Sequence, residues 1–326
     1  MPKIRRIVLL LGDRFMLPFV YPVAWLFRNI RRVGLQNLPL CRDAMLAMGM
    51  IPIRDHYYEP RINFQALRHP LDSVRNLPGI DWNLVGQLAL LKQFIYADEL
   101  VDLSVAGTAP NEFRFGNGTF ESGDAEFWYQ LIRAKRPRRI IEIGSGNSTL
   151  VARKAISANR ACQSEYICQH ICIEPYEMPW LESTGVQVVR QRLEDVDRLL
   201  FESLGENDVL FIDSSHVIRP QGDVLVEFLE ILPLLKPGVI VHVHDIFSPR
   251  DYPRSWIVDE IKLWNEQYLL EAFLSHNRDW EIIGALNYLH HQDYGSLKRV
   301  APFLLPNRQP GSFYMRRLAA AAEVKP

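Results

Sequence analysis

Arg139-Ile-Ile-Glu-Ile-Gly-Ser-Gly-Asn-Ser-Thr-Leu150 is the stretch of this chain that decides its fold. The apolar run is typical of a buried strand that ends near Glu142, and Gly144 and Gly146 form a turn after it. Ser148 and Thr149 then offer hydroxyl caps for a following helix. A Gly-x-Gly turn between a strand and a helix lets a ligand approach the backbone and directs free helix N–H groups toward an anion.

This turn departs from a dinucleotide-binding fingerprint at its third glycine. The pattern G-x-G-x-x-G has a glycine where this chain has Thr149, so a nicotinamide-dependent oxidoreductase is the less favoured alternative. A glycine turn beside an acidic strand end suits a ligand with an ammonium, a carboxylate and an adenosine, which describes S-adenosylmethionine. We therefore expect Glu142, Gly144, Gly146 and Ser148 to bind the methionine end of that cofactor.

Short apolar segments alternate with helical ones along the rest of the chain. Strands are expected at residues 139–143, 170–174, 186–190, 208–213, 239–245, 280–286 and 311–316, and helices at 82–100, 124–136, 222–235 and 256–275. This alternation predicts a Rossmann-like α/β fold with a seven-stranded sheet, its last strand antiparallel, and helices on both faces. Ligands of such sheets lie beyond the carboxyl ends of the strands, so the polar residues there are the candidates for chemistry.

Acidic and basic residues follow the second and third expected strands. Glu174 comes after the second strand, about one βαβ unit from the glycine turn, and can accept both hydroxyls of a ribose. Arg192 follows the third strand and would border the adenine ring. Together these residues predict the adenosine half of the cofactor site.

Two aspartates and two histidines follow the fourth and fifth expected strands. Asp213 and His216 lie after the fourth strand, and His244 and Asp245 after the fifth. Clustered acids repel one another unless a cation or proton lies between them, and a hard divalent ion accepts oxygen ligands readily. Such an ion would lower the pKa of a bound hydroxyl, and His216 could then take its proton.

These residues match a family pattern. Glu-x-Gly-x-Gly after the first strand, Glu174 after the second, Asp-x-x-His after the fourth and Lys-Pro-Gly before the fifth resemble class I S-adenosylmethionine-dependent methyltransferases. Within that class the chain is similar to the macrocin-type, metal-dependent sugar O-methyltransferases. The resemblance implies Asp213 and Asp245 as metal ligands and His216 as the catalytic base. It also implies that the loop 113–120 covers the cofactor, with Asn117 near the methionine moiety.

The chain departs from the family pattern at one position. His244 stands where the first acid of the second pair is expected, and it is a third candidate metal ligand. Histidine is a poor ligand for magnesium and a better one for manganese, iron or zinc. A divalent metal, magnesium or manganese, is therefore expected beside S-adenosylmethionine, with its identity open.

Residues 1–80 form an N-terminal helical and apolar extension, and residues 81–326 form the methyltransferase domain in this interpretation. The segment from Ile7 to Phe27 is largely apolar with arginines at its flanks, but Asp13, Arg14, Pro18 and Pro22 argue against a clean membrane span. Either it packs on the main domain, or residues 1–32 lie in a membrane surface with arginines toward anionic headgroups. A true membrane span or a signal peptide is the less favoured alternative.

The net charge and the number of cysteines limit the expected binding partners and the cellular compartment. A net charge of −1 implies no general attraction to nucleic acid. Four cysteines in this length make no disulfide scaffold, so we expect the protein in a reducing cytoplasm. The N-terminal segment adds an expected contact with the inner face of the membrane. We expect O-methylation of a saccharide or glycolipid hydroxyl. A small phenolic or nitrogen nucleophile is the nearest alternative acceptor. A non-catalytic module with the same fold is an alternative hypothesis for the function.

Overall fold

The computed structural model describes residues 3–101 and 111–319. By internal contacts the chain divides into two compact units, one up to His69 and one from Pro70. The division therefore falls ahead of the boundary at residue 80 that we expected. The second unit contains the sheet and all of the candidate site residues.

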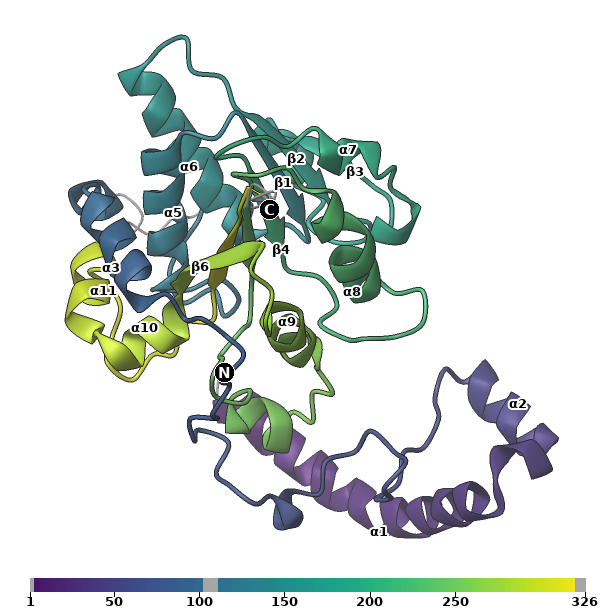
Figure 1. Ribbon diagram of the computed structural model, residues 1–326. Helices are drawn as coiled ribbons and strands as arrows, with labels where there is room; N and C mark the ends of the chain where they lie inside the picture. Colours follow the sequence, from purple (N-terminus) through teal and green to yellow (C-terminus); the bar gives the residue numbers. More distant parts are fainter. Residues whose placement is uncertain (1–2, 102–110, 320–326) are drawn as a thin grey trace, which may run out of the picture. The chain divides into compact units, whose positions relative to one another are not determined.

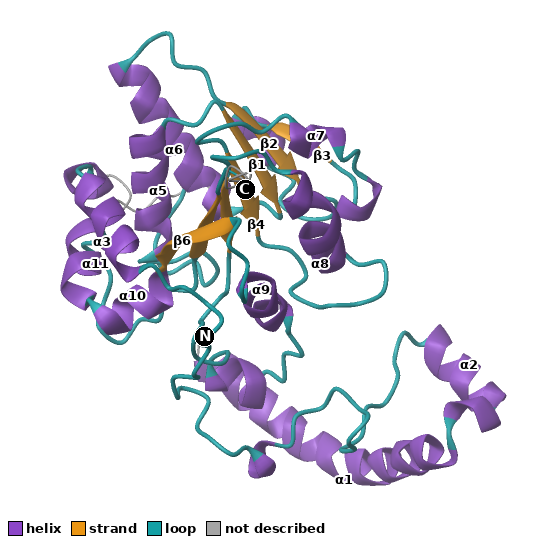
Figure 2. Ribbon diagram, viewed as in Figure 1, coloured by secondary structure: helices purple, strands orange, loops and turns teal. Residues whose placement is uncertain are grey.

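All seven expected strands are present, within two residues of their predicted bounds, as a single sheet (Figures 1 and 2). They are β1 (Arg139–Ile143), β2 (Gln169–Ile173), β3 (Gln187–Val189), β4 (Val209–Ile212), β5 (Ile240–Val243), β6 (Trp280–Ala285) and β7 (Phe313–Arg317). The strand order is β3-β2-β1-β4-β5-β7-β6, and β7 runs antiparallel to both of its neighbours. The Rossmann-like fold with an antiparallel last strand is confirmed.

The helices follow the predicted pattern only in part. The helix expected over 82–100 ends at Gln93, and the one expected over 222–235 is α-helical to Val226 and continues as a π-helical and a 3-10 segment. Observed are α3 (Leu84–Gln93), α5 (Asp124–Lys135), α6 (Asn147–Cys162), α7 (Leu199–Glu202), α8 (Asp223–Val226), α9 (Glu266–Leu274), α10 (Leu286–Gln292) and α11 (Tyr294–Val300). The helix expected over 256–275 is divided into a π-helical turn, Ser255–Asp259, and α9, because Ile261 takes a left-handed φ of 55° between them. The helices α10 and α11 between β6 and β7 were not predicted.

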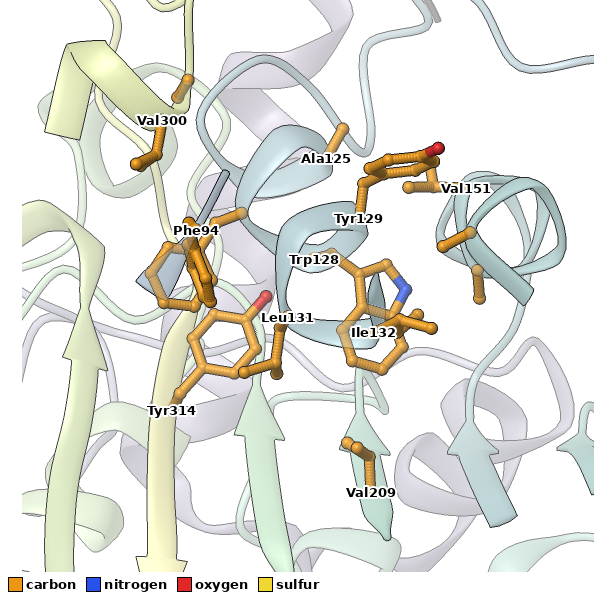
Figure 3. Packing of buried hydrophobic residues seen from close by; sticks show 14 of the residues in the cluster. Phe94, Ala125, Trp128, Tyr129, Leu131, Ile132, Val151, Val209, Val300 and Tyr314 are labelled. Carbon is orange, nitrogen blue, oxygen red and sulfur yellow. The ribbon is translucent and has the colours of Figure 1, made fainter. Parts of the chain in front are cut away.

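Two hydrophobic clusters, one on each face, hold the sheet between its helices. Alternate residues of β1 point to opposite faces, so Ile140 joins one cluster while Ile141 and Ile143 join the other. Figure 3 shows Trp128 and Ile132 of α5 directed toward the sheet in the first of these clusters. Trp128 is fully buried, and its Nε1 donates a hydrogen bond to the carbonyl of Ser148 at 3.2 Å. The core is therefore tied to the start of α6, next to the glycine turn.

The first unit consists of α1 (Lys3–Val33), a 3-10 turn (Leu35–Asn37), α2 (Pro39–Ala47) and an extended segment that follows them. The helix α1 is continuous, with Pro18 and Pro22 inside it. Among the described residues, one helix is long and apolar enough to cross a membrane by length and composition, and it covers Arg5–Val33 of α1.

Candidate functional site

The glycine turn after β1 is packed against the end of β4. Gly144 has a φ of 74°, its N–H donates to the carbonyl of Ile173 at 3.0 Å, and a Cβ at this position would lie 1.9 Å from the carbonyl oxygen of Asp213. A side chain at position 144 is therefore excluded by the fold itself. Gly146 differs, because its nearest neighbour would be the flexible side chain of Met178 at 3.4 Å. A small side chain at Gly146 would therefore make only ordinary contact with Met178.

Glu142 supports this turn from beneath. Its side chain is fully buried on the face of β1 that α6 covers, where it accepts hydrogen bonds from the hydroxyls of Thr149 and Ser148, the latter at 3.4 Å. His170 Nε2 lies 3.0 Å from the same carboxylate. Thr149 also accepts the N–H of Gly146 at 3.1 Å. Glu142 and Ser148 thus shape the turn, and the backbone of the turn is the part that faces outward.

Glu174 lies against the glycine turn at the end of β2. One carboxylate oxygen accepts the backbone N–H groups of Tyr176 and Glu177 at 3.1 and 2.9 Å, and the other is 3.4 Å from the N–H of Ser145. A depression of about 460 Å³ borders this point, lined by residues that include Pro175 and Tyr176. The glycine turn and Glu174 are therefore neighbours at the ends of β1 and β2.

Two further cofactor candidates have partners of their own. Asn117 uses both amide hydrogens within its loop, on the carbonyls of Arg114 and Phe120 at 2.8 Å each, and its oxygen accepts from Thr119 and Phe120. It organises the loop, which is joined to α6 through Thr119. Arg192 is half exposed and pairs with Glu194 at 2.5 Å. Neither side chain is directed at the glycine turn by a contact in the structure.

The ends of β4 and β5 bring two aspartates and two histidines together. His216 Nε2 is 3.3 Å from Asp213 and 3.8 Å from Asp245, and His244 Nδ1 is 3.4 Å from Asp213 and 3.6 Å from Asp245. One ligand atom from each of Asp213, His216 and Asp245 falls within 4.8 Å of the others. His216 and Asp245 have φ values of 59° and 60°, a left-handed conformation that non-glycine residues adopt at a cost and that is frequent at functional sites.

The neighbours of this cluster determine its charge state. Burial opposes ionisation of Asp213, but the charge of His244 and the hydrogen bond from His216 outweigh it and hold the pKa of Asp213 below its usual range. Burial also opposes a charged imidazole at position 244, yet Asp245 and Asp213 outweigh it and raise the pKa of His244 to about 10. Both histidines of the ion-free cluster therefore hold protons near neutral pH, since the pKa of His216 is raised too, against burial, by Asp213 and Glu266.

Glu266 and Trp264 belong to this site and were missed in the sequence. Glu266 begins α9, is fully buried, and accepts a hydrogen bond of 2.8 Å from His216 Nδ1. Trp264 lies against the His216 ring, with 4.1 Å between ring centroids. No spacing signal marks either residue, because each is about fifty positions from His216 and an acidic residue at a helix start is common.

Comparison with known proteins identifies the class. Residues 141–246 match a family model described as a methyltransferase domain. An uncharacterized protein of Archaeoglobus fulgidus is 30% identical over 176 residues, which cover 49% of this chain and 76% of that protein. The matched segment runs from β1 to the residue after Asp245, so it includes the glycine turn, Glu174 and the acid–histidine cluster.

Solved structures are similar at low identity. An O-methyltransferase from Bacillus cereus, in complex with S-adenosylhomocysteine, is 13% identical, with 73% of this chain and 98% of that chain covered and a TM-score of 0.37. The MycE methyltransferase of the mycinamycin pathway, in complex with Mg, S-adenosylhomocysteine and mycinamycin VI, is 13% identical, with 61% and 50% covered and a TM-score of 0.34.

The chain belongs to the class I S-adenosylmethionine-dependent methyltransferases. The match to a methyltransferase domain makes it an enzyme.

Proposed function

We propose that this enzyme transfers the methyl group of S-adenosylmethionine to a hydroxyl of a saccharide or glycolipid, with a divalent metal, in the manner of the macrocin-type branch. The observation that carries the proposal is the convergence of Asp213, Asp245 and His216 at the carboxyl ends of β4 and β5. Ligands of open α/β sheets bind at this edge, and the glycine turn opens onto it from β1.

The cofactor is gripped by backbone and one carboxylate in this proposal. The backbone at Gly146 and the N–H groups at the start of α6 accept the methionine end, while Glu142 and Ser148 fix the turn from below. Glu174 accepts the ribose hydroxyls. The loop around Asn117 lies over α6, held by the bond from Asn147 to Thr119 at 2.8 Å. Arg192 would border the adenine from the edge of the sheet.

The donor set of the cluster fits a divalent cation. His244 Nδ1 is buried and has no hydrogen-bond partner within the described part of the chain, although it faces two carboxylates. Asp213, Asp245 and His244 would hold the ion, and this mixture of nitrogen and oxygen ligands suits manganese better than magnesium. When bound, such an ion lowers the pKa of the acceptor hydroxyl.

His216 is the proposed base. Its Nδ1 donates to Glu266, which fixes the ring orientation and leaves Nε2 at the mouth of the site to receive the hydroxyl proton. Glu266 also favours the imidazolium that results. The role of the protein in this reaction is then to align the hydroxyl opposite the sulfonium, to exclude water and to remove one proton.

An aromatic wall next to His216 supports a saccharide acceptor. Trp256 and Trp264 are half-buried, 5.1 Å apart between ring centroids, and Lys262 Nζ lies 4.0 and 4.2 Å from the two rings. Amphipathic aromatic rings of this kind offer an apolar face to the C–H groups of a sugar while polar groups bind its hydroxyls. A phenolic ring would also stack there, so it is the second acceptor to test.

The proposed location is the cytoplasm, with residues 1–32 in contact with the inner face of the membrane. The exposed apolar surface of α1 and the arginines at its ends support this placement. This proposed location is independent of the proposed methyl transfer.

The reaction is tested by incubating the purified protein with methyl-labelled S-adenosylmethionine, with manganese or with a chelator, and with free saccharides, lipid-linked saccharides and catechols in turn. We expect transfer to a saccharide hydroxyl that needs manganese. Asp213→Asn should abolish metal-dependent transfer, and His216→Gln should lower the rate by about 10²- to 10⁴-fold while metal binding persists. Transfer that is unaffected by both substitutions, or that occurs only on catechols, would refute the assignment.

A further inference from the structure

The largest unexplained feature of the first unit is an arginine-lined pocket. It has a volume of about 1080 Å³ and lies between the C-terminal part of α1 and the extended segment after α2. Arg28, Arg31 and Arg32 line it from α1, and Arg54 and Arg61 line it from the segment. We call these residues and the space between them the arginine pocket.

Positive charge is in excess at the arginine pocket. Glu59 pairs with Arg31 and lies 3.4 Å from Arg54, while Asp55 is 3.9 Å from Arg61. Two acids thus face five guanidinium groups. Within the described residues, the buried Nε of Arg31 has no hydrogen-bond acceptor, and the buried Nε of Arg54 has only the ion pair with Glu59 at 3.4 Å, which lacks hydrogen-bond geometry. A multivalent anion with several oxygens is the ligand that would satisfy these donors, since guanidinium groups bind phosphate through paired hydrogen bonds.

The pocket adjoins an apolar surface that the described residues of the first unit leave exposed. The side chains from Ile7 to Leu11 are each more than half exposed, and five successive residues of a helix point in all directions around its axis. A helix that is apolar all round is stable in the interior of a protein or in lipid, and none of the apolar window of α1 is buried. Ile7 to Phe27 extends about 30 Å, which is close to the thickness of a bilayer's hydrocarbon core.

The order of residues along α1 relates the two features. The apolar surface ends at Trp25 and Phe27, which line the pocket, and the arginines of the pocket begin with the next residue, Arg28. Trp25 is 67% exposed, as expected of an aromatic side chain at the boundary between lipid and water. Asp13 and Arg14 are the charged residues inside the apolar stretch, and they are adjacent and of opposite sign.

We propose that the arginine pocket binds the phosphate of an anionic membrane lipid while the apolar surface of α1 enters the acyl chains of the same membrane. The charge of the pocket and its place at the end of an apolar helix both match a lipid whose phosphate lies at the headgroup level. The inference rests on the proposed membrane contact of residues 1–32 and adds a site and a ligand class to it. It is independent of methyl transfer.

The test is flotation of the full-length protein with phosphatidylcholine vesicles that contain either phosphatidic acid or a charge-matched amount of oleate. The pocket variant is Arg28→Gln with Arg61→Gln, which changes one residue on each wall. The control variant is Arg5→Gln with Arg6→Gln, which removes the same charge from the other end of α1.

We expect the unmodified protein to prefer phosphatidic acid over oleate by about tenfold or more, because a phosphate offers several converging guanidinium groups more acceptor oxygens than a single carboxylate does. The pocket variant should lose this preference, and the control variant should keep it even if both affinities fall. Equal preference in all three proteins would overturn the pocket while leaving membrane contact intact.

Three other outcomes would contradict the lipid proposal as a whole. Failure to float with any vesicle would refute both the pocket and the proposed membrane contact. Binding of inorganic phosphate by the pocket without flotation would identify a soluble phosphate as the ligand and refute the lipid. Self-association through α1 without lipid, measured by sedimentation, would show that a second copy of the chain covers the apolar surface. Methyl transfer should be unaffected by the pocket variant on soluble acceptors.

Discussion

The two glycines of the turn after β1 are expected to fail in opposite ways when each is replaced by alanine. In Gly144→Ala the new Cβ would lie 1.9 Å from the carbonyl of Asp213, on a residue whose φ is 74°. In Gly146→Ala the new Cβ would meet the side chain of Met178 at 3.4 Å, an ordinary contact. The first change therefore tests the fold and the second tests the ligand site.

The magnitudes follow from these distances. A left-handed conformation costs a residue with a Cβ about 1–2 kcal/mol, and the forced shift of packed backbone adds about 1–3 kcal/mol. Gly144→Ala should therefore lower the free energy of unfolding by about 2–5 kcal/mol, a large part of the stability of an ordinary domain. Gly146→Ala should change the free energy of unfolding by less than about 1 kcal/mol. Its added methyl group would occupy space beside the cofactor and weaken binding by about tenfold or more, or about 1.4 kcal/mol.

Thermal unfolding of both variants, together with calorimetric titration of S-adenosylhomocysteine, separates the two effects. Gly144→Ala should melt at a clearly lower temperature, and Gly146→Ala should melt like the unmodified protein but bind the ligand weakly. The reasoning would be refuted if Gly146→Ala bound S-adenosylhomocysteine normally, or if Gly144→Ala left the melting temperature unchanged.

Three further predictions concern the acid–histidine cluster. Glu266→Gln removes the charge that raises the pKa of His216, so the acid limb of the pH–rate profile should move to lower pH while kcat falls; a limb that stays in place would contradict the pairing. Manganese must displace the proton that His244 holds, because the pKa of His244 is about 10. The affinity of the protein for manganese, measured by calorimetry, should therefore rise by up to about tenfold per pH unit between pH 7 and 9. A manganese affinity that does not change with pH would show that no proton is released. Trp264→Ala should raise KM for the acceptor by about tenfold while the affinity for S-adenosylhomocysteine is unchanged, and equal losses in both would show a general collapse of the site.

The negative charge of the acid–histidine cluster can be compensated by protons or by a metal ion. Without an ion, protons on His216 and His244 partly offset the charges of Asp213, Asp245 and Glu266. A protonated His216 cannot accept a proton from the substrate. A cation beside the aspartates would replace those protons and lower the pKa of His216, so ion binding and activation of the base would be coupled.

The strands, the glycine turn and the polar residues at the strand ends were determined by the sequence itself. Runs such as Ile140 to Ile143 are short, apolar and bounded by turn residues, so their local pattern specifies a buried strand wherever they occur. The order of strand and helix then fixes which strand ends share an edge, because connections between parallel strands are right-handed and short. Asp213, His216 and Asp245 could be grouped on that basis.

What only the tertiary structure decided is how side chains from distant segments face one another. The pleat of β1 turns Glu142 toward α6 and away from the ligand side, and Asn117 satisfies its amide within its own loop. Glu266 reaches His216 because α9 packs on the sheet, and the helix expected over 256–275 divides so that Trp264 can lie on the same ring. These contacts join residues far apart in the chain, and their energies depend on packing that local periodicity does not encode.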